Sequence, residues 1–278
     1  KSTFAALTSG TYNTALGYNA MAADTTGASN TALGANSLVA NTTGEQNVAI
    51  GYEALTANTT ASYNTAVGKG SMAATTTGSN NTALGRSSLI TNTTGAYNVA
   101  VGKEALLANT TASENTAVGN QALLDNTTGV ENAAFGESAL ANNTTAANNT
   151  ALGRTALFTN TTGAANTAIG HQAMRQTTTA SNNVAVGKSA LYANTTGTDN
   201  TAVGYLALDA NTSGAQNTGI GRDALGANTT GIKNTAVGTT SLGANTTGTE
   251  NVALGYLTFD ANTTGSYSTA VGTKALGA

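Results

Sequence analysis

The sequence predicts an all-β protein, a parallel β-solenoid (β-roll) of about sixteen coils of 17 residues each. An asparagine recurs every 17 residues from Asn13 to Asn251, and Ser268 takes its place in the last repeat. A glycine stands four residues after each of these positions, from Gly17 to Gly272, and no insertion or deletion interrupts the period. A period this short and strict indicates that each repeat is one coil stacked on its neighbours. Positions within a repeat are numbered here from this anchor residue, so the glycine is at position +4.

The first predicted element of each coil is a short strand over positions 0 to +4, with the consensus Asn-Thr-Ala-Val-Gly. Position +1 is Thr or Val apart from Ala133, position +2 is Ala apart from Gly219, and position +3 is always large and apolar. Because alternate residues of a strand point to opposite faces, positions +1 and +3 share one face. We expect that face to line the interior of the coil and the Ala and Gly columns to form a flat outer face.

The second predicted element is another short strand, centred on positions +7 and +8. Position +7 is small, and position +8 is Leu, Met or Phe, as in Met21, Leu38 and Phe259. We expect position +8 to form a second core column. An Asn-Thr-Thr-Gly block follows at positions +11 to +14 and is typical of a turn, because Asn hydrogen-bonds to its own backbone and Gly accepts positive φ. Each coil is therefore predicted to have two short strands joined by tight turns.

The predicted core is thin, and this favours an oligomer. Two large apolar residues per coil contribute roughly 3–6 kcal/mol, whereas ordering each residue of the coil costs about 1 kcal/mol or more in backbone entropy. We expect the flat Ala/Gly face to pack against a partner chain. Residues 1–278 are predicted to be a single continuous solenoid in which no capping sequence is visible. The expected partner is a copy of the same chain, in a homotrimer or in an end-to-end polymer.

Composition narrows the functional classes. The chain has no cysteine, which excludes disulfides and thiolate metal sites, and its net charge of −3 gives no attraction to nucleic acid. No apolar run of 18 residues is present, so we expect no insertion into a membrane. His171 is the only histidine, which leaves no catalytic triad and no metal cluster. We predict that the protein is not an enzyme and that it has no catalytic residue, no cofactor and no metal site.

Exposed columns are the remaining candidates for function. Charged residues avoid positions +1 to +4, whereas basic residues and tyrosines gather at position +5. This column could bind glycans or a host surface, or it could be a solvated edge that keeps the protein soluble. The candidate contact ribbon consists of Tyr18, Tyr52, Lys69, Arg86, Lys103, Arg154, Lys188, Tyr205, Arg222 and Tyr256.

The Asn-Thr-Thr block allows two further readings. It matches the Asn-x-Thr/Ser pattern of N-glycosylation, as at Asn41, Asn58, Asn92 and Asn109, although a turn requires the same residues. Its adjacent threonine columns also resemble those of ice-binding β-solenoids, although neighbours at positions +12 and +13 are expected to face opposite ways. Ice binding and glycan binding therefore stay as alternatives.

A resemblance to a known family adds to these predictions. The segments Asn47-Val48-Ala49-Ile50-Gly51, Asn98-Val99-Ala100-Val101-Gly102 and Asn183-Val184-Ala185-Val186-Gly187 resemble the head repeats of YadA-like trimeric autotransporter adhesins. The repeated Asn-Thr-Ala-Val-Gly segments are also similar to stretches of phage tail-fibre-like proteins that precede a self-cleaving chaperone domain. The resemblance implies a left-handed parallel β-roll that trimerises in a bacterial surface adhesin.

Together, the period and the resemblance predict a non-catalytic structural rod in an extracellular fibre, filament or surface adhesin. The expected location is extracellular, at the cell surface or in a virion fibre.

Overall fold

The computed structural model describes residues 3–277, and the prediction of an all-β, parallel β-solenoid is confirmed. Each strand covers positions +1 to +3 of its repeat, and no helix is present in the described range. The strands are β1 (Thr14–Leu16), β2 (Thr31–Leu33), β3 (Val48–Ile50), β4 (Thr65–Val67), β5 (Thr82–Leu84), β6 (Val99–Val101), β7 (Thr116–Val118), β8 (Ala133–Phe135), β9 (Thr150–Leu152), β10 (Thr167–Ile169), β11 (Val184–Val186), β12 (Thr201–Val203), β13 (Thr218–Ile220), β14 (Thr235–Val237), β15 (Val252–Leu254) and β16 (Thr269–Val271).

The chain divides into two compact units, and each is a stack of coils. The first unit runs to Ser138 and includes Asn143–Thr145, so it contains β1 to β8. The second unit consists of Ala139–Asn142 and of the chain from Ala146 to residue 277, and it contains β9 to β16. That residues 1–278 form a single continuous solenoid stays a prediction.

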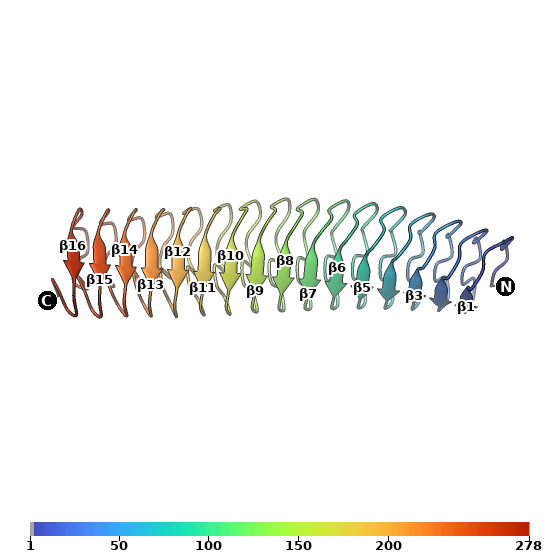
Figure 1. Cartoon of the computed structure of the whole chain (residues 1–278), viewed down its shortest axis with the longest axis horizontal. Coiled ribbons are helices and arrows are strands. Elements are labelled where there is room, and N and C mark those ends of the chain that lie inside the picture. Colours follow the sequence, from blue (N-terminus) through green and yellow to red (C-terminus); the bar gives the residue numbers. More distant parts are fainter. Residues whose placement is uncertain (1–2, 278) are drawn as a thin grey trace. The chain divides into compact units, whose positions relative to one another are not determined.

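Strands pair in parallel and without shift inside each unit. In the first unit Thr14 lies opposite Thr31, and in the second unit Thr167 lies opposite Thr150, so equivalent positions of successive coils form straight columns. Figure 1 shows the strands of each unit side by side, with the rest of each coil returning behind the sheet. One position of the repeat therefore has the same environment in every inner coil of a unit.

The orientation predicted for the strands is wrong. Position +2 is buried in each inner coil, as at Ala49 and Ala202, whereas positions +1 and +3 are half-buried or exposed. The interior is too narrow for a large side chain on the strand side, because position +8 already fills it. At Gly219, which replaces the usual Ala, an added Cβ would lie 3.3 Å from the Leu208 side chain. The Ala column therefore packs against the Leu column, and the large +3 side chains point outward.

The second core column is confirmed, but the second strand is wrong. In the inner coils, from Met21 to Leu242, the residues at position +8 are fully buried, whereas Leu276 in the last coil is exposed. However, positions +6 and +8 adopt positive φ, as in Glu53 at 58° and Leu55 at 50°. This left-handed conformation is incompatible with a strand. The segment still stacks on the next coil, since the Leu55 amide donates to the Ser71 carbonyl at 3.0 Å. Each inner coil thus has one strand and one large buried side chain rather than two of each.

The predicted turn at positions +11 to +14 is confirmed. The Asn41 side-chain amide donates to the Gly44 carbonyl at 3.0 Å, so the asparagine bonds to its own backbone. The expected positive φ at position +14 is wrong, because Gly44 is not among the residues with positive φ. Position +14 is small for a different reason, which is its close approach to the next coil: at Gly27 an added Cβ would lie 2.5 Å from the Gly44 carbonyl oxygen, and alanine, as at Ala61, is the largest residue found at this position.

Candidate functional surface

The outer face of each sheet is built from the odd positions of the repeat. Position +3 exposes large apolar side chains, with exposed fractions of 43% at Leu33, 48% at Leu152 and 40% at Ile220. Position +1 adds Thr or Val beside them. Positions −1 and +5 flank each strand and are polar, charged or aromatic apart from Ala165 and Ala35. Each unit therefore presents an apolar band, formed by the large +3 side chains with the mostly threonine +1 column beside them, between two mainly polar edges.

The candidate contact ribbon lies at one of these edges. Tyr18, Tyr52, Lys69, Arg86 and Lys103 belong to the first unit, and all five are exposed. The second unit contributes the other five, which are Arg154, Lys188, Tyr205, Arg222 and Tyr256, also exposed. The fold thus aligns the ribbon residues of each unit in a column, while their role in contact stays a prediction.

Neighbouring ribbon residues interact with one another. The Lys69 ammonium lies 5.7 Å from the centre of the Tyr52 ring, and Lys188 lies 5.8 Å from that of Tyr205, which are cation–π distances. Arg222 lies 3.3 Å from the Asp223 carboxylate. These contacts tie side chains of the ribbon to adjacent coils or to their own turn, so part of its charge is already satisfied.

Glu104, at position +6 beside the ribbon, contacts two basic residues of the ribbon and one glutamine. Gln121 donates to its carboxylate at 3.0 Å, Arg86 does so at 3.0 Å, and Lys103 lies 3.4 Å away. The hydrogen bond from Gln121, followed by those from Arg86 and Lys103, lowers the pKa of Glu104. The carboxylate is therefore ionised at neutral pH and neutralises part of the basic charge in this stretch.

His171 and the acidic side chains do not form a catalytic or metal centre in the described residues. His171 is half-buried at position +5, and residues 3–277 contain no group of three or more His, Cys, Asp or Glu side chains placed to hold a metal ion. No pocket is found over the same range. The extended hydrogen-bond networks of the described residues lie instead in the interior of the coils.

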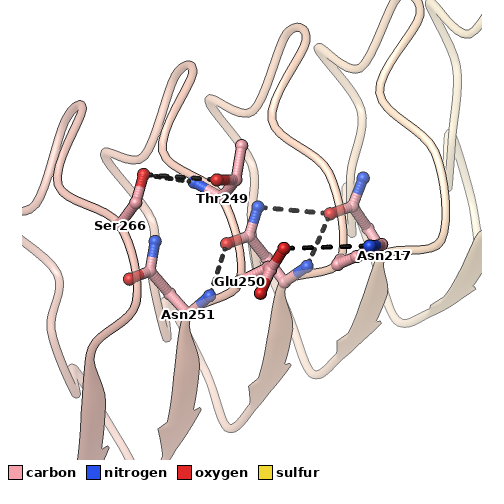
Figure 2. Close-up of polar contacts among 7 residues, drawn as sticks. Asn217, Thr249, Glu250, Asn251 and Ser266 are labelled. Atoms are coloured by element: carbon pink, nitrogen blue, oxygen red, sulfur yellow. Dashed lines mark hydrogen bonds and ion pairs between the residues drawn. The ribbon is translucent and has the colours of Figure 1, made fainter.

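The anchor asparagines form a buried ladder, and the sequence reasoning did not place their side chains in the interior. The Asn234 amide donates to the Asn217 Oδ1 at 3.2 Å and to the Gly248 carbonyl at 2.7 Å, while its backbone N–H donates to the same Asn217 oxygen at 2.9 Å. Figure 2 shows this ladder continuing to Asn251. A fully satisfied buried network of this kind fixes the register of every coil. The signal was present: a polar residue retained at one position of every repeat.

Figure 2 also shows a hydrogen bond and an ion pair that join the same coils nearer their surface. The Thr249 backbone N–H donates to the Ser266 hydroxyl at 2.9 Å, and Lys233 forms an ion pair with Glu250 at 3.7 Å. Both contacts are at least partly exposed. Exposed ion pairs contribute about 0–1 kcal/mol, so the buried ladders rather than these contacts hold the coils in register.

A second ladder at position +11 bears on N-glycosylation. Asn109 is fully buried, and its amide nitrogen donates to the Asn92 Oδ1 and to the Ala112 carbonyl, both at 3.0 Å. The same two bonds recur at Asn58, where they measure 2.8 and 3.1 Å. An amide nitrogen that is buried and donates twice is not accessible to a glycosyltransferase. The folded coil therefore excludes N-glycosylation at these asparagines.

The +11 ladder begins with an aspartate. Asp24 is fully buried, and its Oδ1 accepts from the Gly27 N–H at 3.0 Å and from the Asn41 amide at 3.2 Å. Its Oδ2 has no partner, at the place where an asparagine would carry its donor nitrogen. Burial raises the pKa of Asp24, and the hydrogen bonds to Gly27 and Asn41 only partly oppose this effect.

We expect Asp24→Asn to stabilise the protein at neutral pH by about 1–3 kcal/mol, the cost of an unsatisfied buried polar group. Because the folded pKa is above the unfolded one, the stability that Asp24 contributes is greatest below pH 3.8 and is lost as pH rises through the folded value. Denaturant midpoints measured at pH 3.5 and pH 7 should therefore differ less in the variant than in the parent. Asp125→Asn, at an exposed carboxylate, is the control. An equal shift of the midpoint at both pH values would contradict the burial argument.

Comparisons with known proteins give no relative. No family model, no curated protein and no solved structure matches the chain. Between residues 3 and 277, the structure has no helix with the length and apolar character needed to cross a bilayer. Arguments about function therefore rest on the geometry above.

Proposed function

We propose that the chain is a non-catalytic structural rod of an extracellular fibre, filament or surface adhesin, and that it assembles with copies of itself. The observation that carries the proposal is the apolar band on the outer face of each sheet. Leu84 and Leu254 expose 38% and 40% of their surface, in columns that contain no charged residue. The partner-facing surface is thus the +1/+3 face, and not the Ala/Gly face expected from the sequence.

The size of the band supports assembly. The band continues over all eight strands of one unit without a charged residue. Large contiguous apolar patches on a soluble protein mark interaction sites. Burying this surface also offsets the weakness of an interior with one large side chain per coil. The charged and tyrosine-rich edges then form the polar rim of the contact.

Native mass by light scattering tests this proposal. We expect a discrete assembly, at about three times the chain mass of 27.2 kDa for the predicted trimer, and much larger species if copies also join end to end. A stable monomer at micromolar concentration would contradict self-assembly. Small-angle scattering on the same sample would test the rod, since sixteen coils in one stack would span roughly 75–80 Å at about 4.8 Å each.

Leu84→Lys is expected to weaken assembly at least tenfold, because it places an unpaired charge in the middle of the apolar band. Leu84 lies on the outer face, so the coil itself should still fold, which circular dichroism can check. The matched control is Asn120→Lys, which adds the same charge at the exposed and already basic +5 column. Equal effects of the two substitutions on the dissociation constant would show that net charge, and not the apolar band, controls assembly.

Ice binding is the alternative that one observation favours. Thr is the commonest residue at position +1, and unshifted pairing places these threonines in a column along the flat outer face of each unit, as at Thr218 and Thr235. This face, and not the +12/+13 pair suggested by the sequence, is the regular surface. Thermal hysteresis of a monomeric preparation tests it, and a freezing point equal to the melting point would eliminate the alternative. Contact of the ribbon with surface glycans or a host surface stays a further proposal within the adhesin reading.

A further inference from the structure

Position +13 carries a row of exposed hydroxyl groups in each unit. All of these residues are exposed, and in the part of the chain that the structure describes none of their hydroxyls takes part in a hydrogen bond. They are Ser9, Thr26, Thr43, Thr60, Thr77, Thr94, Thr111, Thr128 and Thr145 in the first unit, and Thr162, Thr179, Thr196, Ser213, Thr230, Thr247 and Thr264 in the second.

The neighbouring threonines at position +12 differ in this respect. The Thr229 hydroxyl donates to the Thr246 carbonyl of the next coil at 3.0 Å, and the Thr93 hydroxyl donates to the Thr110 carbonyl at the same distance. Both side chains are half-buried. The stacking of coils therefore explains why position +12 is threonine. It gives no such reason for position +13, because the Thr230 backbone amide bonds to Thr246 whatever its side chain is.

The other exposed columns vary in sequence, whereas position +13 keeps a hydroxyl group that stacking does not explain. Position +5 is exposed in most coils and varies freely, from Tyr52 to Lys69 to Arg86 in successive coils, and position −1 varies in the same way. Position +13 changes only from threonine to serine, at Ser9 and Ser213. Serine keeps the hydroxyl and loses the methyl group, whereas a requirement for β-branching would also admit valine. The hydroxyl group itself is therefore what every coil retains.

We propose that the +13 hydroxyls are acceptor sites for O-linked glycosylation by a glycosyltransferase that uses a nucleotide sugar. In this reaction Oγ1 attacks the anomeric carbon, a C–O bond forms, the bond to the nucleoside diphosphate breaks, and the hydroxyl proton passes to a base of the transferase. The site suits this chemistry because each hydroxyl lies on an exposed turn and is free of any bond that would have to be broken. The same turn keeps its asparagine buried, so the sugar is directed to threonine and away from the amide nitrogen.

Coil spacing sets the density of modification. Successive +13 hydroxyls are about 4.8 Å apart, which is close to the width of one sugar ring. Single sugars can therefore line the row, but branched chains on adjacent coils would collide. We expect each modified threonine to carry one short sugar chain. Such a row of sugars would cover the turn edge of each stack with hydroxyl groups and would leave the outer face of the sheet free.

Intact-mass and peptide-fragmentation measurements on the protein isolated from cells that naturally make it test the proposal. We expect peptides that contain position +13 to be heavier than the unmodified polypeptide, with sugar residues assigned to position +13 and none to position +12 or to the +11 asparagines. Unmodified masses for all of these peptides would overturn the proposal, and so would sugars confined to other positions.

A matched pair of variants separates modification from structure. Thr230→Val should remove the sugar from its coil in the natural host and leave the thermal midpoint of the unmodified recombinant chain unchanged. Thr229→Val, one residue away, should keep the sugar at Thr230 and lower that midpoint, because it deletes the 3.0 Å bond to Thr246. If Thr230→Val lowers the midpoint of the unmodified chain as much as Thr229→Val does, position +13 has a structural role and the proposal fails.

Discussion

Gly153→Ala is expected to destabilise the second unit by at least about 3 kcal/mol. Gly153 has φ of 136°, a conformation that side chains disfavour, and an added Cβ would lie 2.5 Å from the Gly170 carbonyl oxygen of the next coil. The atoms it would meet belong to the backbone, so no side chain can move away to make room. Denaturant unfolding followed by circular dichroism should show the loss, together with faster amide hydrogen exchange in the coils around Gly170.

The control for this substitution is Gly226→Ala. Gly226 lies at position +9, where other coils place Ala141 and larger residues, and an added Cβ would come no closer than 3.3 Å to the Asp223 carbonyl oxygen. The φ of Gly226 is not in the left-handed region. We expect a change within about 1 kcal/mol, with some gain from a less flexible unfolded chain. Equal losses from the two substitutions would contradict the argument that position +4 is restricted by the neighbouring backbone.

Asn98→Ala is the second substitution with a large expected effect. The Asn98 amide donates to the Asn81 Oδ1 at 3.1 Å and to the Ala112 carbonyl at 2.9 Å, and its Oδ1 accepts from the Asn115 N–H at 3.0 Å. Alanine would leave the Asn115 N–H buried without its acceptor, whereas the Ala112 carbonyl would keep the hydrogen bond from Asn109. An unsatisfied buried group costs about 1–3 kcal/mol and each further hydrogen bond lost costs about 1 kcal/mol, so we expect a loss of about 3 kcal/mol or more in the first unit.

Amide hydrogen exchange is the measurement that locates this loss. Exchange should accelerate at the Asn115 amide before it changes in distant coils, because coils contact only their neighbours. The control is Asn120→Ala, at an exposed +5 position of the same unit, where the free energy of unfolding should change by less than about 0.5 kcal/mol. A similar change in both variants would show that the ladder contributes little.

The period, the turn and the +8 core column could be predicted because each leaves a direct signal in the sequence. The spacing of the anchor residues sets one coil, Asn-Thr-Thr-Gly selects a turn, and Leu38 or Leu55 at a fixed position needs burial. These features depend on residue type and spacing alone. They are independent of which way the strand faces.

Which face of the strand lies inside could not be predicted by the rule that large apolar side chains are buried. Hydrophobicity favoured placing Leu33 and Ile50 inside, yet the interior admits only Ala32 and Ala49 on the strand side. Variability was the better guide: position +3 changes among Leu, Ile, Val and Phe, whereas the buried anchor stays asparagine. The positive φ of Leu55 has no sequence signal, because leucine is a residue that normally avoids it. Tertiary packing alone imposes that conformation.

The asparagine ladder has a consequence for the gene. Anchor asparagines bond to the coil before them, through the backbone N–H and in many coils also through the side chain, and to the turn of their own coil, as Asn200 does with Asn183 and Gly214. An insertion of one residue would reverse which side chains enter the interior, and one of a few residues would separate these bonding partners. Only the gain or loss of seventeen codons, or a multiple, restores every bond. Recombination between repeats therefore changes this protein in steps of one whole coil, and its dimensions can be altered without redesigning any contact.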